Sequence, residues 1–102
     1  PIIEERKRLS RDGVVVVAFS VEEDSGKPVG FPEILSSGFG ALEETDELFE
    51  NTAKMVLTRL DEESLAHLEL EQLRALVSES VSRFLYKQAR MRPKVFTVIE
   101  QI

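Results

Sequence analysis

Residues 82–98, SRFLYKQARMRPKVFTV, decide the fold, because a helical pattern passes directly into a strand pattern there. Before the proline, apolar residues recur at the spacing of an amphipathic helix. Pro93 disfavours helical geometry at Arg92, so we expect the helix to stop at that point. The chain should then continue as a strand over residues 94–102, apolar on both of its faces.

The first third of the chain predicts two more strands. Residues 14–21 are β-branched or aromatic at most positions and apolar on both alternating faces, which is typical of a central strand buried on both sides. Residues 24–26, DSG, predict a reversal into a hairpin, since the glycine permits positive φ. Residues 28–35 should form the second strand. Pro28 and Pro32 lack N–H donors, so this strand must lie at an edge or be bulged.

Two amphipathic helices are expected between these strands. Thr45 has the chemistry of an N-cap, and a helix should run from it to about Leu60. A second helix is predicted from about Glu69 to Arg90. Each has one apolar stripe, made by Leu48, Phe49, Thr52, Ala53, Val56, Leu57 and Leu60 in the first helix and by Leu70, Leu73, Val77, Val81, Phe84, Leu85 and Gln88 in the second.

These elements predict an α+β fold in the order strand, strand, helix, helix, strand. The expected architecture is a three-stranded mixed sheet with the first strand central, covered on one face by the two helices. Two helices leave the second face bare, and about five large side chains would forfeit roughly 1.5–3 kcal/mol each by staying in water. We therefore expect a second copy or other domains of a longer protein to cover that face. The predicted interface residues are Val15, Val17, Phe19, Phe96 and Val98.

Length and composition indicate one soluble globular domain. The chain has 102 residues, of which 42% are hydrophobic and 31% charged. No apolar run approaches the roughly 20 residues of a membrane span, so no membrane contact is expected. The absence of cysteine excludes a disulfide scaffold and fits a reducing cytoplasm. The chain begins at Pro1 without a secretory pattern, which favours excision from a longer cytoplasmic protein.

Charge is distributed unevenly along the chain. The net charge of -6 argues against polyanion binding, yet residues 83–94 contain only basic charges. Three of these cations recur at helical spacing and so share one face. They are candidates for holding RNA phosphates, although cations also suit a helix C-terminus and can pair with acids of the first helix. The RNA-binding candidates are Arg83, Lys87, Arg90, Arg92 and Lys94.

Two stretches carry a resemblance to a known family. Residues 82–98 resemble the last helix and strand of the C-terminal domain of ribonuclease J, a ribonuclease of the metallo-β-lactamase/β-CASP group. Residues 9–39, LSRDGVVVVAFSVEEDSGKPVGFPEILSSGF, resemble the first strand, turn and Ser-Gly-Phe bend of the same domain. The resemblance implies that residues 1–12 are a linker from upstream catalytic domains and that residues 13–102 form the C-terminal domain.

The resemblance also implies a function for the parent protein. Such enzymes are metal-dependent 5′→3′ exoribonucleases and endoribonucleases of RNA maturation and decay, which use zinc and/or manganese and assemble as dimers or tetramers. Their metal-binding motifs lie upstream, and this chain has one histidine, His67, and no recognisable nucleophile with a base. We therefore predict no catalytic or metal-binding residue and no enzymatic activity here.

Two interpretations of the chain remain open at this point. In the first, it is an assembly and stabilising domain that forms a homodimer and contacts the upstream catalytic domains. In the second, it is an auxiliary module that guides single-stranded RNA to those domains.

Overall fold

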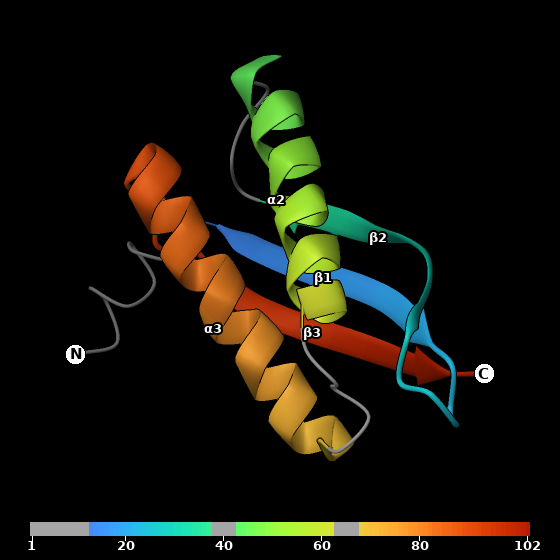
Figure 1. Cartoon of the computed structure of the whole chain (residues 1–102). Helices are drawn as coiled ribbons and strands as arrows, with labels where there is room; N and C mark the ends of the chain where they lie inside the picture. Colours follow the sequence, from blue (N-terminus) through green and yellow to red (C-terminus); the bar gives the residue numbers. More distant parts are fainter. Residues whose placement is uncertain (1–12, 38–42, 63–67) are drawn as a thin grey trace.

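The strands form a sheet with both helices on one face, as the computed structural model shows for residues 13–37, 43–62 and 68–102 (Figure 1). The elements follow in the predicted order, and the α+β class is confirmed. The predicted linker, residues 1–12, and His67 lie outside the described residues. The bounds are β1 (Val14–Val21), β2 (Pro28–Ser37), α2 (Glu43–Glu62), α3 (Leu70–Ala89) and β3 (Lys94–Gln101).

The strand order is β2-β1-β3, so the prediction that the first strand is central is confirmed. β1 pairs antiparallel with β2 and parallel with β3, which makes the sheet mixed. β2 lies at an edge, as its prolines require, and the register shifts between Ala18 and Ser20. Both consequences predicted for Pro28 and Pro32, an edge position and a bulge, are therefore present.

The hairpin between β1 and β2 closes at the predicted turn. Gly26 adopts a φ of 72°, a left-handed conformation that strains any residue with a Cβ. Its main-chain N–H donates to the Glu22 carbonyl oxygen at 2.8 Å, and the Glu22 N–H donates to the Lys27 carbonyl oxygen at 2.9 Å. The turn is thus fixed by its own backbone.

Helix α3 begins and ends where the sequence indicates. Glu69 is its N-cap and forms a capping box with Gln72, whose side-chain oxygen accepts the Glu69 N–H at 3.0 Å. Arg90 ends the helix in the left-handed conformation, with a φ of 55°, three residues before Pro93. The expectation that Gln88 belongs to the apolar stripe is wrong, because the buried row of α3 ends at Leu85 and Gln88 is exposed.

Helix α2 differs from its prediction at its first turn. It begins at Glu43, so Thr45 lies inside the helix and is not its N-cap. Glutamate is a good helix former, so the helix begins two residues earlier than predicted. The predicted stripe is otherwise confirmed, with Val56 and Leu60 buried.

The core lies between the helices and one face of the sheet. Its largest fully buried side chains include Val15 and Val17 of β1, Val56 of α2 and Leu85 of α3. The two buried threonines have hydrogen-bond partners within this layer. Thr52 donates to the Leu48 carbonyl oxygen at 2.7 Å, and the hydroxyl oxygens of Thr97 and Ser78 lie 2.7 Å apart. Satisfied polar groups of this kind can be buried at little cost.

Leu85→Ala should lower the free energy of unfolding by about 2–5 kcal/mol, because Leu85 is 0% exposed and its truncation leaves a cavity in the core between α3 and the sheet. Chemical denaturation followed by circular dichroism measures this change. Lys87→Ala, two residues further along the same helix and exposed, is the matched control and should change stability by less than about 0.5 kcal/mol. Equal effects of the two substitutions would contradict the position of the core.

Candidate interaction surfaces

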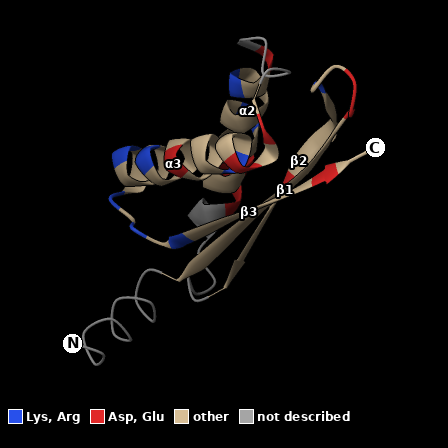
Figure 2. Ribbon diagram, turned by 90° about the horizontal axis from the view of Figure 1, so that it is seen from below, with Lys and Arg blue, Asp and Glu red and all other residues tan. Residues whose placement is uncertain are grey.

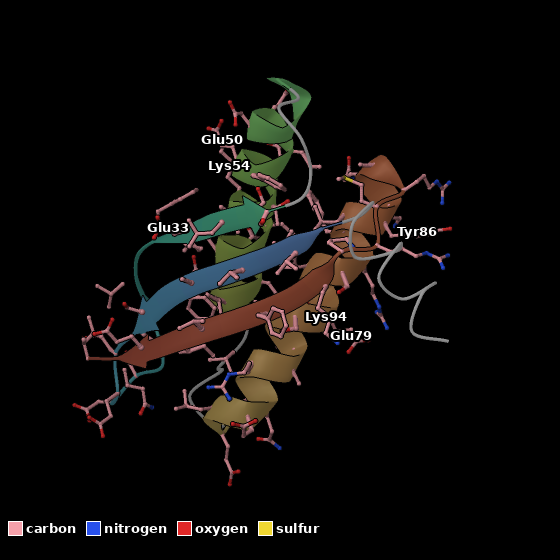
Figure 3. The ribbon with its side chains drawn as sticks, turned by 180° about the vertical axis from the view of Figure 1, so that it is seen from behind. Glu33, Glu50, Lys54, Glu79, Tyr86 and Lys94 are labelled. Atoms are coloured by element: carbon pink, nitrogen blue, oxygen red, sulfur yellow. The ribbon has the colours of Figure 1, made fainter. Side chains whose placement is uncertain are left out.

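One face of the sheet has no described element against it. Figure 2 shows both helices on the same side of the strands, and Figure 3 shows the other side. Five large apolar side chains there are between 42% and 56% exposed. We call this surface the open face; its apolar residues are Val14, Val16, Ala18, Val29, Phe31, Leu35, Phe96 and Val98.

The strand register arranges these side chains in rows across the sheet. Leu35 pairs with Val16, which pairs with Phe96, and these three form an apolar row. In the next row, Ala18 lies between Glu33 and Val98. Since partners in register point to the same face, the open face is a continuous apolar surface with few charges in it.

The predicted interface set combined residues of two opposite faces. Phe96 and Val98 lie on the open face, but Val15, Val17 and Phe19 are buried beneath the helices, so their assignment to an exposed interface is wrong. Strand β1 is apolar on both faces, and its sequence alone could not show which face the helices cover. The sequence prediction of a bare apolar face is nevertheless confirmed for the described residues.

The outer edge of β3 is blocked by a side chain from α3. Main-chain N–H groups of Lys94 and Ile102 donate to the carbonyl oxygens of Gly13 and Val21, at 3.1 and 3.0 Å. In a parallel pair alternate residues bond to the same neighbour, so the intervening Thr97 directs its carbonyl away from β1.

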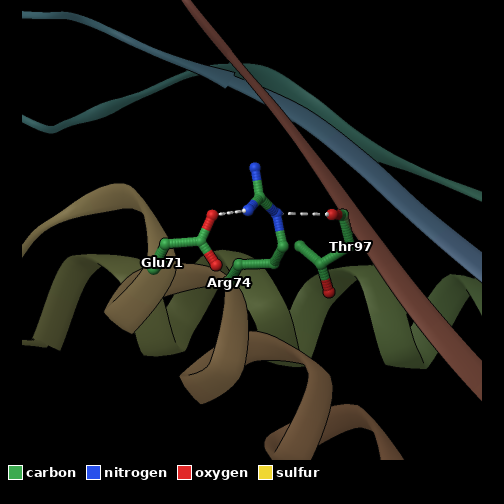
Figure 4. Close-up of polar contacts among 3 residues, drawn as sticks. All are labelled: Glu71, Arg74 and Thr97. Carbon is green, nitrogen blue, oxygen red and sulfur yellow. Dashed lines mark hydrogen bonds and ion pairs between the residues drawn. The ribbon is translucent and has the colours of Figure 1, made fainter.

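Arg74 donates a hydrogen bond to that outward carbonyl oxygen. Its Nε donates to the Thr97 oxygen at 3.2 Å, while Glu71 pairs with the same guanidinium (Figure 4). A charged side chain on an edge strand discourages the addition of another strand, and the prolines of β2 act similarly on the opposite edge. Sequence reasoning missed Arg74, because its contact joins residues 23 positions apart and no local pattern marks it.

The five predicted RNA-binding cations lie near the end of α3 and the start of β3, but they differ in their contacts. Arg83 pairs with Glu79 on its own helix. Arg90 and Arg92 place their guanidinium carbons 5.2 and 4.6 Å from the centre of the Tyr86 ring. Among the described residues, no cation of this group pairs with an acid of α2. No ion pair among the described residues involves the other four cations, so they are available to bind an anionic partner: Lys87, Arg90, Arg92 and Lys94.

Tyr86 is partly exposed and lies in a cationic environment. Its pKa is lowered from the ordinary value of 10.0, chiefly by hydrogen bonding with Arg92, then by the positive charge of Arg92 and by hydrogen bonding with Arg90. The guanidinium groups are also attracted to the face of the Tyr86 ring, which keeps them beside it. We call Tyr86, Lys87, Arg90 and Arg92 the basic aromatic cluster.

The described ranges contain neither a metal-ligand cluster nor a membrane-spanning helix. Residues 13–37, 43–62 and 68–102 contain no group of three or more His, Cys, Asp or Glu side chains arranged to hold a metal ion. None of the helices described is both long and apolar enough to cross a membrane.

Comparison with known proteins identifies similar sequences over the whole chain. The family model for the ribonuclease J C-terminal domain matches residues 1–102. Ribonuclease J2 of Bacillus subtilis is 22% identical over 102 residues, and a ribonuclease J 2 of Staphylococcus epidermidis is 24% identical over 103. Each alignment covers 99% of this chain but 18% of the relative. The chain thus spans about a fifth of the length of these relatives.

Arg92→Ala should raise the pKa of Tyr86 toward its ordinary value, because the substitution removes the largest causes that stabilise tyrosinate. Tyr86 is the single tyrosine and the chain has no tryptophan, so its ionisation can be followed by ultraviolet absorbance. The wild type should ionise at lower pH than Arg92→Ala. Arg83→Ala, which removes a cation paired with Glu79, is the control and should leave the titration unchanged.

Proposed function

Because the chain belongs to the ribonuclease J C-terminal domain family, we propose that it is the assembly and stabilising domain of a ribonuclease J-like enzyme. In this proposal two copies associate through the open face and so join two enzyme molecules. The single observation that carries the proposal is the exposure of five large apolar side chains on that face. Contiguous apolar patches of this kind are typical of interaction sites.

Burial of the open face would favour association. Complete burial of a large apolar side chain contributes roughly 1.5–3 kcal/mol relative to full exposure, and the five side chains of each copy are 42–56% exposed, so each would add about half of that amount. Part of this gain is offset by the translational and rotational freedom lost on binding. The rows of β1, β2 and β3 present these side chains on a rigid sheet, so little further ordering is needed.

We propose further that the whole protein is a metal-dependent ribonuclease acting in RNA maturation and decay, from the 5′ end or at internal sites, in the cytoplasm. Its relatives are named ribonucleases J, which supports a hydrolase of RNA. The metal, zinc or manganese, would activate a water molecule in catalytic domains outside this chain. In this proposal the contribution of this domain is indirect: it positions and stabilises the catalytic domains.

A second candidate function rests on the basic aromatic cluster. Lys87, Arg90 and Arg92 have no carboxylate partner among the described residues, and the ring of Tyr86 lies beside two of them. Phosphate contacts from unpaired cations with an aromatic stacking surface are the usual means of binding single-stranded RNA. In this role the domain would hold RNA near the catalytic domains.

Phe96→Glu should convert the dimer to a monomer, because it places a charge in the central row of the open face. Analytical ultracentrifugation at tens of micromolar measures the change, and circular dichroism should show an unchanged fold. Gln88→Glu, which adds the same charge at an exposed position of α3, should leave the dimer intact. Phe19→Glu, which places its charge under the helices, should unfold the chain instead.

A wild-type chain that sediments as a monomer at these concentrations would contradict the assembly proposal. A Phe96→Glu dimer as stable as the wild type would exclude the open face as the contact surface.

Reversing the charges of Lys87, Arg90 and Arg92 to glutamate should abolish binding of single-stranded RNA, because phosphate attraction becomes repulsion. Fluorescence anisotropy with a labelled oligonucleotide at several salt concentrations measures the affinity. Arg83→Glu is the comparison and should have a smaller effect, because Arg83 already pairs with Glu79. The RNA-binding function would be rejected if the wild type did not bind the oligonucleotide at low salt, or if its affinity did not fall as salt was added.

A further inference from the structure

The open face has charged residues at both ends of its β3 row. The outward-facing residues along this strand are Lys94, Phe96, Val98 and Glu100, which read as a cation, two apolar side chains and an anion. Both charged side chains are exposed, and neither forms an ion pair among the described residues. Six residues of strand separate them by about 20 Å, which is beyond the screening length at physiological salt. They therefore cannot satisfy each other within one chain.

From this pattern we infer that two copies stack face to face about a twofold axis that lies between the sheets and runs across the strands. The inference rests on the proposed assembly function and specifies its geometry. In this arrangement each β3 lies antiparallel over β3 of the second copy. Phe96 faces Val98 of the second copy, and Lys94 faces Glu100 of the second copy. Symmetry repeats each contact, so the dimer gains two equivalent ion pairs.

Other arrangements fit the charges less well. A twofold axis along the strands would place β2 over β3 of the second copy, so that Lys94 would lie over Ser37 and Glu100 over Val29, and neither would meet an opposite charge. Edge-to-edge pairing would require a free strand edge. Arg74 occupies the outward carbonyl of Thr97 on β3, and Pro28 and Pro32 interrupt the donors of β2. Stacking across the strands is therefore the arrangement that combines apolar burial with charge complementarity.

This geometry assigns Lys94 to the open face rather than to RNA. Sheets packed face to face lie about 10 Å apart, a distance that a lysine and a glutamate side chain can span together. Ion pairs at the rim of an apolar interface mainly select the orientation and register of the partners. Lys94 and Glu100 thus act as orientation determinants, while Phe96 and Val98 supply the buried area.

Mixing two single variants tests this geometry. Lys94→Glu leaves two acids on the row and Glu100→Lys leaves two cations, so each variant alone should repel its own copy. Each should dimerise roughly tenfold or more weakly than the wild type. Mixed in equal amounts, the two variants should form a heterodimer near wild-type affinity, because each cation then faces an acid. Sedimentation with one variant fluorescently labelled measures the mixed species. Added salt should weaken the heterodimer and the wild type and strengthen each separate variant.

The outcomes distinguish this inference from the proposed function. A wild-type dimer that Phe96→Glu abolishes, combined with variants that remain weak after mixing, would overturn the across-strand geometry and leave the assembly function standing. A wild-type monomer would overturn both. Glu33→Lys serves as the control, because it also changes a charge on the open face but should show no rescue when mixed with Lys94→Glu.

Discussion

The structure depends on a central strand that is apolar on both of its faces. Alternate residues of β1 enter the core under α2 and α3, and the residues between them point to the open face. Only one of these faces can be covered by two helices that share a side of the sheet. The exposed apolar surface is therefore a consequence of the sequences of all three strands, and the proposed association would cover it.

The fold was largely predictable from local pattern. The bulged edge strand followed from Pro28 and Pro32, the end of α3 from Pro93, and the central position of β1 from its two apolar faces. The start of α2 was not predicted correctly, because several adjacent acids can occupy the first turn equally well. Placing Val15, Val17 and Phe19 at an exposed interface failed for a different reason: helix packing selects between two equally apolar faces, and that choice depends on contacts across the whole chain.

The two candidate surfaces lie on different parts of the domain. The open face is apolar and belongs to all three strands, whereas the basic aromatic cluster gathers at the end of α3 and in the segment before β3. Their separation allows one domain to hold a partner protein without occupying the cations near Tyr86. The unequal contacts of these cations could not be read from their helical spacing, because Arg83 pairs with Glu79 on the same helix while the other cations form no ion pair among the described residues.

The contact between Arg74 and the Thr97 carbonyl has a consequence for how far association can proceed. If a molecule could associate both through a sheet face and by strand pairing at an edge, further copies could add in two directions and the assembly could grow without limit. With its exposed hydrogen-bond acceptor occupied by a guanidinium, β3 offers incoming chains no template in its central portion. The growth of fibrils by strand addition at this position is thereby disfavoured.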